Sequence, residues 1–327
     1  MIRLISRQQV KDLLTYEDTI RIIESAFIDI SSGKAILHPR VRIDIPQRRG
    51  RQTVMMAFVE SCDGLGMKFS TMFELDPQHR VNAVNIILND AKKGGIIAIM
   101  DANYITEVRT ASGSAVATKY LAREDATTLS IIGAGIQGRS HLKAISLVRP
   151  IQRVMAYDPV RESLDKFKHM AEEELPQLKV EVVGSPKEAV KGADIVCTTS
   201  ISPTPVVEFP WVKPGTHINA VGAWTPKTRE IDSATVAAAK VVLDSRIAIM
   251  SEAGDILIPI AEGIIKEDHI YGEIGEICSG SKPGRTHPKE ITLYKSVGSA
   301  AMDMATAMVV YQRAVERNVG TLVSDLQ

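Results

Sequence analysis

The segment Gly133–Gly138, with the sequence GAGIQG, has the spacing in this chain that most clearly predicts a chemical role. It follows a candidate strand over residues 128–132, and a helical pattern begins beyond it, which is the context that a G-x-G-x-x-G turn requires. The first glycine, Gly133, permits the tight turn, and the second, Gly135, lets the backbone approach a pyrophosphate. The helix N-terminus then offers unpaired N–H groups to the phosphates. The segment predicts a dinucleotide-binding turn.

Asp158 lies 20 residues beyond Gly138, at the end of the next apolar run. A carboxylate at this point accepts hydrogen bonds from a ribose 2′-hydroxyl and repels a 2′-phosphate, so Asp158 favours NAD(H). Arg161 is close enough in sequence to hold that phosphate, which leaves NADP(H) possible.

Hydride transfer to a substrate with a carboxylate requires fixed cations and a proton source. Three cations stand in apolar strand or helix settings: Lys68 near two glycines, Arg42 in an alternating strand pattern, and Arg109 at the start of a small-residue helix. Taken singly, each is more typical of a surface or ion-paired cation. Composition alone does not identify any of the three as a functional residue.

The histidines and cysteines show no metal-ligand spacing, so we expect no metal site. His141 and His217 are expected to be structural. Asp255 and Glu276 lie in a polar stretch that could border a cleft, but solvated loop carboxylates are the favoured interpretation.

The elements that would position these residues fall into two patterns. From residue 127 onward, candidate strands alternate with helical segments, which predicts a parallel, doubly wound sheet. The strands are expected at residues 128–132, 153–157, 179–183, 195–199, 217–221 and 241–244. The helices between them include residues 161–174 and 185–192.

The first part of the chain has a different rhythm. Residues 1–33 are predicted to be helical, with helix caps at Ser6 and Thr15 and a stop at Gly33. Residues 40–101 alternate like strands joined by short turns, which predicts an antiparallel sheet. Residues 103–121 and 300–316 are predicted helices.

Composition excludes several classes of protein. The 327 residues carry 39 basic and 39 acidic side chains, so no global charge attracts nucleic acid or an anionic membrane. No apolar run approaches the ~20 residues of a membrane span, and the N-terminus lacks a signal-peptide pattern. Three cysteines form no CxxC pair. We expect a cytoplasmic protein of two domains.

Several segments together resemble the ornithine cyclodeaminase/μ-crystallin family of dinucleotide-dependent enzymes. The likeness covers nearly the whole chain, and the combination of RTA, GxGxxG and HINAVG is specific. The matching segments are Met67–Lys68, Ile105–Ala111, Gly133–Gly138, His217–Gly222, Arg229–Asp232 and Thr292–Gly298.

The resemblance implies an α/β protein with a Rossmann-type doubly wound parallel sheet over residues 118–299. It also implies a second, α+β domain for substrate binding and dimerisation, built from residues 1–117 and 300–327, and a homodimer. Substrate contacts would come from Lys68, also the catalytic candidate, from Arg109, and from Arg42 or alternatively Arg40. The implied cofactor contacts are Arg109, Thr110, Gly133, Gly135, Ile136, Gln137, Gly138, Asp158, Val221 and Ser296.

One position departs from part of the family. Ornithine cyclodeaminases and the related archaeal alanine dehydrogenases carry an aspartate two residues after the glycine of the NAVG-type segment, where this chain has Trp224. An indole has a single N–H donor and cannot deprotonate an amine. The μ-crystallin side of the family, which reduces cyclic ketimines, also lacks the aspartate.

The leading hypothesis is therefore NAD(P)H-dependent reduction of a cyclic imino acid of the Δ1-pyrroline-2-carboxylate type to the cyclic amino acid, with Trp224 against the substrate ring. The alternatives are an NAD-dependent dehydrogenase of alanine or another small amino acid, an ornithine cyclodeaminase, which Trp224 disfavours, and a non-catalytic dinucleotide- or ligand-binding protein. The small-molecule substrate would be an imino or amino acid of amino-acid metabolism.

Overall fold

The computed structural model describes residues 1–76 and 79–324 and divides them into two compact units. The first unit combines Met1–Arg109 with Ser299–Gln327, and the second is Thr110–Gly298. The division falls inside the helix α3 (Asn103–Leu121), between Arg109 and Thr110 rather than at the expected residues 117 and 118. The first unit therefore takes its residues from both ends of the chain.

The first unit is built on an eight-stranded sheet with the order β16-β1-β7-β6-β5-β4-β2, and β3 also pairs with β4. Its neighbouring strands are antiparallel except for the parallel pair β1 and β7. The strands are β1 Ile2–Ile5, β2 Ala35–Leu37, β3 Val41–Ile45, β4 Gly50–Val59, β5 Gly64–Asp76, β6 His79–Asn89, β7 Ile96–Asp101 and β16 Thr321–Val323. The expected sheet over residues 40–101 is thus present.

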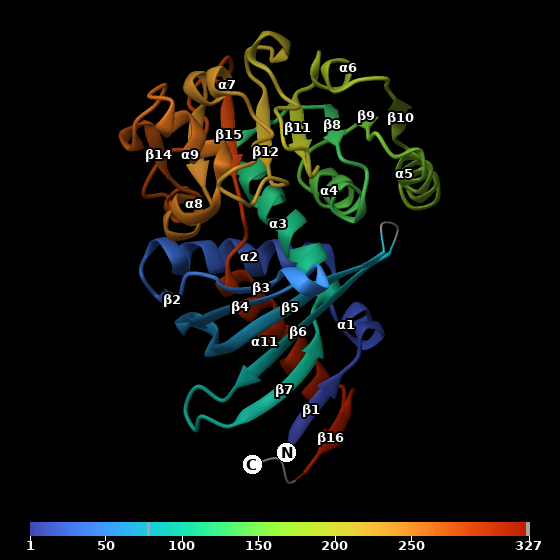
Figure 1. Cartoon of the computed structure of the whole chain (residues 1–327), viewed down its shortest axis with the longest axis vertical. Helices are drawn as coiled ribbons and strands as arrows, with labels where there is room; N and C mark the ends of the chain where they lie inside the picture. The colour runs from blue at the N-terminus through green and yellow to red at the C-terminus, as the bar shows by residue number, and fades with distance from the viewer. Residues whose placement is uncertain (77–78, 325–327) are drawn as a thin grey trace. The chain divides into compact units, whose positions relative to one another are not determined.

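Helices α2 and α11 pack on this sheet and on each other (Figure 1). Alternate strand residues such as Met55, Ala57 and Ile86 are buried in the same apolar core as Met304 and Ala307 of α11. The helices of this unit are α1 Arg7–Leu13, α2 Tyr16–Ser31 and α11 Ala300–Glu316, with short 3-10 helices at Pro46–Arg48 and Glu60–Cys62.

The N-terminal expectation is partly wrong. Residues 2–5 form strand β1, because pairing with β7 and β16 satisfies their backbone groups while Ile2 and Ile5 are buried. The helix caps were placed correctly: Ser6 forms a capping box with Gln9, and the Thr15 side chain accepts a hydrogen bond from the Asp18 N–H.

The second unit contains a parallel sheet of eight strands with the order β10-β9-β8-β11-β12-β15-β13-β14. Helix α4 packs on β8 and β11, and α5 packs on β10 (Figure 1). The strands are β8 Thr128–Ile132, β9 Arg153–Tyr157, β10 Lys179–Val182, β11 Ile195–Thr198, β12 His217–Ala220, β13 Lys240–Leu243, β14 Ile270–Glu273 and β15 Thr292–Lys295. The helices are α4 Ile136–Ser146, α5 Arg161–Glu174, α6 Pro186–Val190, α7 Ser233–Ala238, α8 Arg246–Glu252, α9 Gly254–Ala261 and α10 Ile274–Cys278, with 3-10 helices at Phe209–Trp211 and Glu267–His269.

The six strands expected here are all present within one residue at each end, which confirms the parallel sheet. Strands β14 and β15 were not predicted from the sequence. Strand β15 is short, contains the charged Lys295, and reaches its buried place between β12 and β13 only through tertiary pairing. No helix among the described residues is long and apolar enough to cross a membrane.

Candidate active site

A buried cluster of two cations and one carboxylate lies in the first unit. The Nζ of Lys68 is 2.6 Å from Oδ2 of Asp303, and the Nε of Arg109 is 2.9 Å from Oδ1 of the same carboxylate. Both cationic side chains are 6% exposed and that of Asp303 is 0% exposed. Lys68 and Arg109 were predicted as site residues from the sequence, whereas Asp303, which is 194 residues from Arg109, was not.

Packing of α11 against β5 brings this cluster together. Lys68 is paired with Met55 and Ile86 on the neighbouring strands, on the buried face of the sheet. Gly66, two residues earlier, faces the same helix: a Cβ there would lie 2.2 Å from the Ile87 carbonyl oxygen and 3.0 Å from Sδ of Met304. Glycine at this position therefore allows the close approach of helix and strand that carries Asp303 to Lys68.

The cluster carries an excess positive charge in a desolvated place. Burial lowers the pKa of Lys68 to about 7; Asp303 opposes this fall, whereas Arg109 and Arg40 add to it. The Nη1 of Arg109 is buried without a hydrogen-bond partner among the described residues. An unpaired guanidinium donor beside a net positive charge suits an anionic ligand such as a carboxylate. Lys68 can exchange a proton near neutral pH.

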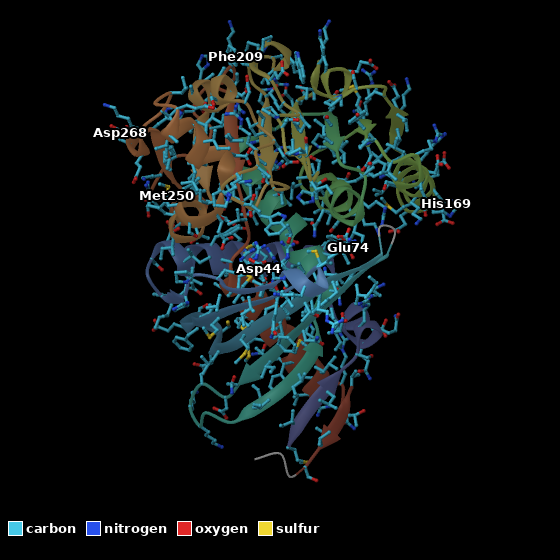
Figure 2. All side chains as sticks on the ribbon, viewed as in Figure 1. Asp44, Glu74, His169, Phe209, Met250 and Asp268 are labelled. Carbon is cyan, nitrogen blue, oxygen red and sulfur yellow. The ribbon has the colours of Figure 1, made fainter. Side chains whose placement is uncertain are left out.

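The two upstream arginines differ in their surroundings. Arg42 forms an ion pair with Asp44, with 2.7 Å between Nη2 and Oδ1, and its side chain is 40% exposed. It lines an open, charged pocket of about 320 Å³ with Arg51 and Glu74; Figure 2 labels Asp44 and Glu74. Arg40 is half-buried, and its charge lowers the pKa of Lys68.

The glycine turn in the second unit has the geometry expected of a phosphate-binding turn. Gly133 has φ of +99°, and a Cβ there would lie 2.7 Å from the carbonyl carbon of Thr199. Gly138 packs against the turn, because a Cβ there would lie 2.1 Å from the Gly133 oxygen. A Cβ at Gly135 would meet nothing within 4 Å, so open space faces the backbone just before α4. These residues fit a dinucleotide.

Asp158 supports the same turn from the position directly after strand β9. Its carboxylate accepts hydrogen bonds from the Ala134 N–H and the Val160 N–H, both at 2.8 Å. Arg161 is paired with Asp165 and its side chain is 80% exposed. Asp158 is therefore directly attached to the predicted phosphate loop, while Arg161 is engaged elsewhere.

A second buried network lies beyond strands β11 and β12. The Glu230 carboxylate accepts hydrogen bonds from the Gly222 N–H at 2.7 Å and the Ala223 N–H at 3.2 Å. Lys295 donates to the Ala223 oxygen at 2.6 Å and lies 2.7 Å from Asp255. The expectation that Asp255 is a solvated loop carboxylate is wrong, because its side chain is 0% exposed and accepts from two backbone N–H groups.

Glu230, Asp255 and Lys295 were not selected as functional residues from the sequence. The only available signal was that Glu230 and Lys295 lie within family-like segments. Their effect is on the turn that precedes Trp224: Glu230 binds its N–H groups and Lys295 binds a carbonyl. Trp224 itself is half-buried.

The remaining predicted cofactor residues belong to the second unit and come from separate parts of its sequence. Ser296 donates its hydroxyl to Asp244 at 2.7 Å, and that carboxylate also accepts from the Val297 and Gly298 N–H groups. Ile136 is exposed, Val221 and Gln137 are half-buried, and Thr110 is buried.

The two histidines expected to be structural are buried. His141 lies between the Ser114 hydroxyl and the Gln137 carbonyl, and burial lowers its pKa to about 4. Burial lowers the pKa of His217 to about 3. Within the described residues, no group of three His, Cys, Asp or Glu side chains is arranged to hold a metal ion.

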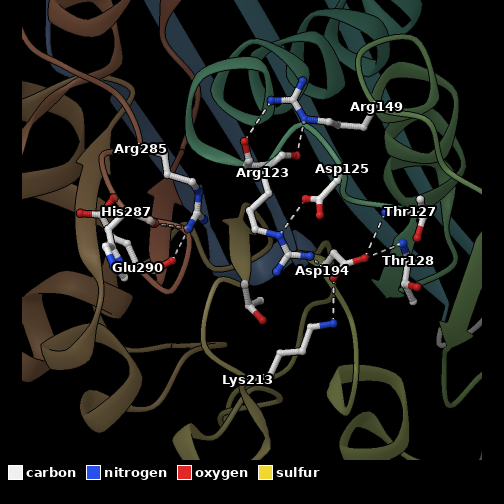
Figure 3. Close-up of polar contacts among 12 residues, drawn as sticks. Arg123, Asp125, Thr127, Thr128, Arg149, Asp194, Lys213, Arg285, His287 and Glu290 are labelled. Carbon is white, nitrogen blue, oxygen red and sulfur yellow. Dashed lines mark hydrogen bonds and ion pairs between the residues drawn. The ribbon is translucent and has the colours of Figure 1, made fainter.

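Another polar cluster lies at the opposite, N-terminal ends of β8 and β11 (Figure 3). Asp194 accepts from the Thr127 and Thr128 N–H groups and is 2.8 Å from Nη2 of Arg123. Arg149 donates to carbonyl groups at the end of α3, including that of Thr118. These contacts join strand starts to a helix end, away from the glycine turn, and we assign them a structural role.

Comparison with known proteins gives a consistent result. The family model described as "Ornithine cyclodeaminase/mu-crystallin family" matches residues 2–318. The chain is 35% identical over 322 residues to the Δ1-pyrroline-2-carboxylate reductase of Bacillus cereus, covering 98% of each chain. The structure of the Thermococcus litoralis Δ1-pyrroline-2-carboxylate reductase with NADH and L-proline superposes with a TM-score of 0.93, at 38% identity over 98% of this chain and 100% of that one. An archaeal alanine dehydrogenase dimer with bound NAD has a TM-score of 0.92, at 32% identity over 99% of both chains.

Proposed function

The chain belongs to the ornithine cyclodeaminase/mu-crystallin family, and from this we propose that it reduces a cyclic imino acid of the Δ1-pyrroline-2-carboxylate type to the cyclic amino acid. The observation that carries the proposal is the buried cluster of Lys68, Arg109 and Asp303. It has one more positive than negative charge, and Nη1 of Arg109 has no hydrogen-bond partner in the part of the chain that the structure describes. The likeness to reductases of this substrate, one of them with NADH and L-proline bound, supports it.

The cluster can bind the substrate carboxylate and supply a proton. Arg109 offers its free Nη1 to the carboxylate, and Asp303 holds the guanidinium in place through Nε. Reduction of the C=N bond requires one hydride at carbon and one proton at nitrogen. Bound NADH supplies the hydride. Lys68, with its pKa near 7, holds a proton at Nζ that it can share with the ring nitrogen, which makes the adjacent carbon more electrophilic.

NADH is the proposed cofactor, with NADPH as the weaker one. The open backbone at Gly135 and the turn at Gly133 suit a pyrophosphate, and Asp158 is positioned at the loop to accept from a ribose hydroxyl. Arg161 is paired with Asp165, so it is less available to a 2′-phosphate.

Trp224 separates this proposal from cyclodeamination. Its indole offers one N–H donor and an apolar face, whereas removal of a proton from an amine requires a base. A flat imine ring can pack on the indole face with about 1 kcal/mol beyond its buried area. The second candidate is an alanine dehydrogenase, which the likeness to the archaeal enzyme supports.

One assay distinguishes these functions. Purified protein is mixed with NADH or NADPH and either Δ1-pyrroline-2-carboxylate or pyruvate, the latter with and without ammonium, and loss of the reduced cofactor is followed. Fast oxidation with the imine alone, and faster with NADH, is the expected result. Oxidation only with pyruvate and ammonium would establish the dehydrogenase instead, and binding of NADH without turnover of any substrate would indicate a non-catalytic protein.

We also propose that the chain forms a homodimer through the sheet face of the first unit opposite to the one that Lys68 occupies. On this face Ile43 is 60% and Met56 37% exposed, and register places Met56 beside the half-buried Met67. Apolar side chains gathered on one sheet face mark an interaction surface. The similarity to the archaeal alanine dehydrogenase, whose structure is a dimer, supports a second copy of this chain as the partner.

The molar mass measured by light scattering, as the protein elutes from a size-exclusion column, tests the proposed dimer. The wild-type chain is expected at twice its 35.7 kDa mass, and Ile43→Lys is expected at the monomer mass. Val160→Lys changes a similarly exposed apolar residue on the second unit, 53% against 60% for Ile43, and should leave the dimer intact. A monomeric wild type, or a dimeric Ile43→Lys variant, would refute this surface. We further propose a cytoplasmic location, with which three cysteines that form no disulfide among the described residues are consistent.

A further inference from the structure

Glu230, Asp255 and Lys295 form a fully buried charged group in the second unit, each with 0% exposure. The Nζ of Lys295 is 2.7 Å from Oδ2 of Asp255, so these two charges neutralise each other. Oδ1 of Asp255 accepts from the backbone N–H groups of Glu230 at 2.7 Å and of Ile231 at 3.0 Å. The Glu230 carboxylate has no cation of its own in these contacts and leaves the group with a formal charge of −1.

Five hydrogen-bond donors surround the Glu230 carboxylate. Oε1 accepts from the Ser200 N–H at 2.8 Å and hydroxyl at 2.6 Å, and Oε2 accepts from the Thr198 hydroxyl at 2.8 Å and the N–H groups of Gly222 and Ala223. Burial raises the pKa of Glu230, and Asp255 adds to the rise, whereas Lys295 and the hydroxyls lower it. Donors at both oxygens favour the ionised carboxylate, which is how a buried charge is held without a counter-ion.

The Glu230 carboxylate lies at the carboxyl ends of β11 and β12. These strands extend the sheet on the side of β8 opposite to β9, so the strand order reverses between β8 and β11. Strand β9 pairs on one side of β8 and β11 on the other, and the chain then continues to β12. Thr198 ends β11, and Gly222 follows β12 by two residues. The loop after β11 also contacts the glycine turn, because a Cβ at Gly133 would lie 2.8 Å from the Ser200 nitrogen. Glu230 therefore connects the loops after β11 and β12 at the switch point, where doubly wound sheets bind dinucleotides.

The direction of a bound dinucleotide follows from the same topology. Its pyrophosphate belongs at the turn after β8, and Asp158 after β9 is the acceptor for the ribose of the adenosine half. The other half, which carries the nicotinamide, must then extend toward β11 and β12, where Ser200 and Gly222 are held by Glu230.

We propose that Glu230 places a buried negative charge behind the nicotinamide half of the cofactor, so that the protein binds the oxidised, positively charged ring more tightly than the neutral reduced ring. The fixed negative charge of Glu230 attracts the positively charged nicotinamide ring of NAD⁺ and has little effect on the neutral ring of NADH. This difference in affinity shifts the equilibrium of the bound cofactor toward the oxidised form. The bound reduced cofactor then releases hydride more readily, which assists reduction of an imine. This inference rests on the cofactor part of the proposed function.

Binding of NAD⁺ and NADH without substrate tests the proposal. Calorimetry gives the Kd of NAD⁺ and fluorescence gives that of NADH, for the wild type and for Glu230→Gln. Removal of one charge is expected to weaken NAD⁺ relative to NADH by about tenfold, the effect of a unit charge about 10 Å away at an effective dielectric of about 20. Glu188→Gln is the control: Glu188 also accepts from a backbone N–H, that of Gly184, but it is exposed and follows the edge strand β10. Its Kd ratio should equal that of the wild type.

The outcomes are distinct. Equal weakening of both forms in Glu230→Gln would show that the carboxylate only positions the loops, and would overturn the proposal. A wild type that binds neither form would overturn the cofactor part of the proposed function together with this inference. If Glu230→Gln does not fold, the double variant Thr198→Val/Ser200→Ala removes two hydroxyl donors and favours the neutral carboxyl, so the same fall in relative NAD⁺ affinity is expected. An unchanged ratio in that variant would overturn the proposal as well.

Discussion

Replacement of Asp303 by asparagine removes the one negative charge from the Lys68 and Arg109 cluster while it keeps the shape of the side chain. Lys68 and Arg109 would lose their shared partner, at 2.6 and 2.9 Å, in a place where neither cation is more than 6% exposed. Lys68 can respond by losing its proton, because burial has already lowered its pKa to about 7. Arg109 cannot respond in this way. The variant therefore changes the protonation of Lys68 more than any other property of the site.

The size of the effect follows from the ion pair. Two unit charges about 4 Å apart interact by about 4 kcal/mol at an effective dielectric of about 20, and a pKa change of one corresponds to about 1.4 kcal/mol. These values correspond to a fall of about three, so we expect the pKa of Lys68 in the variant to lie well below about 6. Because the reaction requires the protonated amine, wild-type activity is present below pH 7 and is lost as pH rises through that value. Asp303→Asn is expected to lose its activity at a lower pH.

The assay is kcat/KM for the imine with NADH from about pH 5 to about pH 9. Asp18→Asn is the control, because Asp18 is ion-paired with Arg313 in the same unit but lies outside the cluster. Its activity profile should match that of the wild type. A basic limb that stays near pH 7 in Asp303→Asn would refute the electrostatic coupling between Asp303 and Lys68.

Stability provides an independent readout of the same cluster. The folded pKa of Lys68 lies below the 10.5 of an ordinary lysine, so the unfolded chain binds more protons between these values and stability rises with pH through that window. Loss of the carboxylate leaves two buried cations, which costs about 3–5 kcal/mol of unfolding free energy where both are charged. The cost should be largest well below about pH 6, where Lys68 is still charged in the variant, and smaller above about pH 7, as measured by urea unfolding.

Three further variants test the remaining assignments. Lys68→Met should lower kcat at least about 100-fold, the range of a positioned acid, with little change in NADH affinity measured by fluorescence; normal turnover would remove its assigned role. Arg40→Met should raise KM for the imine about tenfold or more, because Arg40 is close enough to Lys68 for its charge to lower the pKa of that amine. Arg42→Met should change KM less, because Arg42 is ion-paired with Asp44. A larger KM change in Arg42→Met, measured by steady-state kinetics, would identify Arg42 as the substrate residue. Gly133→Ala should abolish NADH binding and lower the melting temperature, because φ is +99° and the new Cβ would contact Thr199; binding at the wild-type Kd would contradict the tight turn.

The sequence alone determined the features that depend on neighbouring residues. The glycine turn was predictable because Gly133 needs a positive φ and a strand and helix of ordinary pattern flank it. The caps at Ser6 and Thr15 were predictable because the cap and its partner are three residues apart. The family resemblance identified Lys68 and Arg109 by their local motifs.

Only the tertiary structure determined which charged residues form ion pairs with one another. Asp303 joins Lys68 and Arg109 only because α11 packs against β5, which brings together positions about 200 residues apart. Glu230, Asp255 and Lys295 likewise meet only in the folded sheet, and as isolated letters they are indistinguishable from surface charges. Residues 2–5 form a strand because β7 and β16 offer backbone partners there. Local sequence determines local backbone geometry, whereas burial and charge depend on partners that only the complete fold brings into contact.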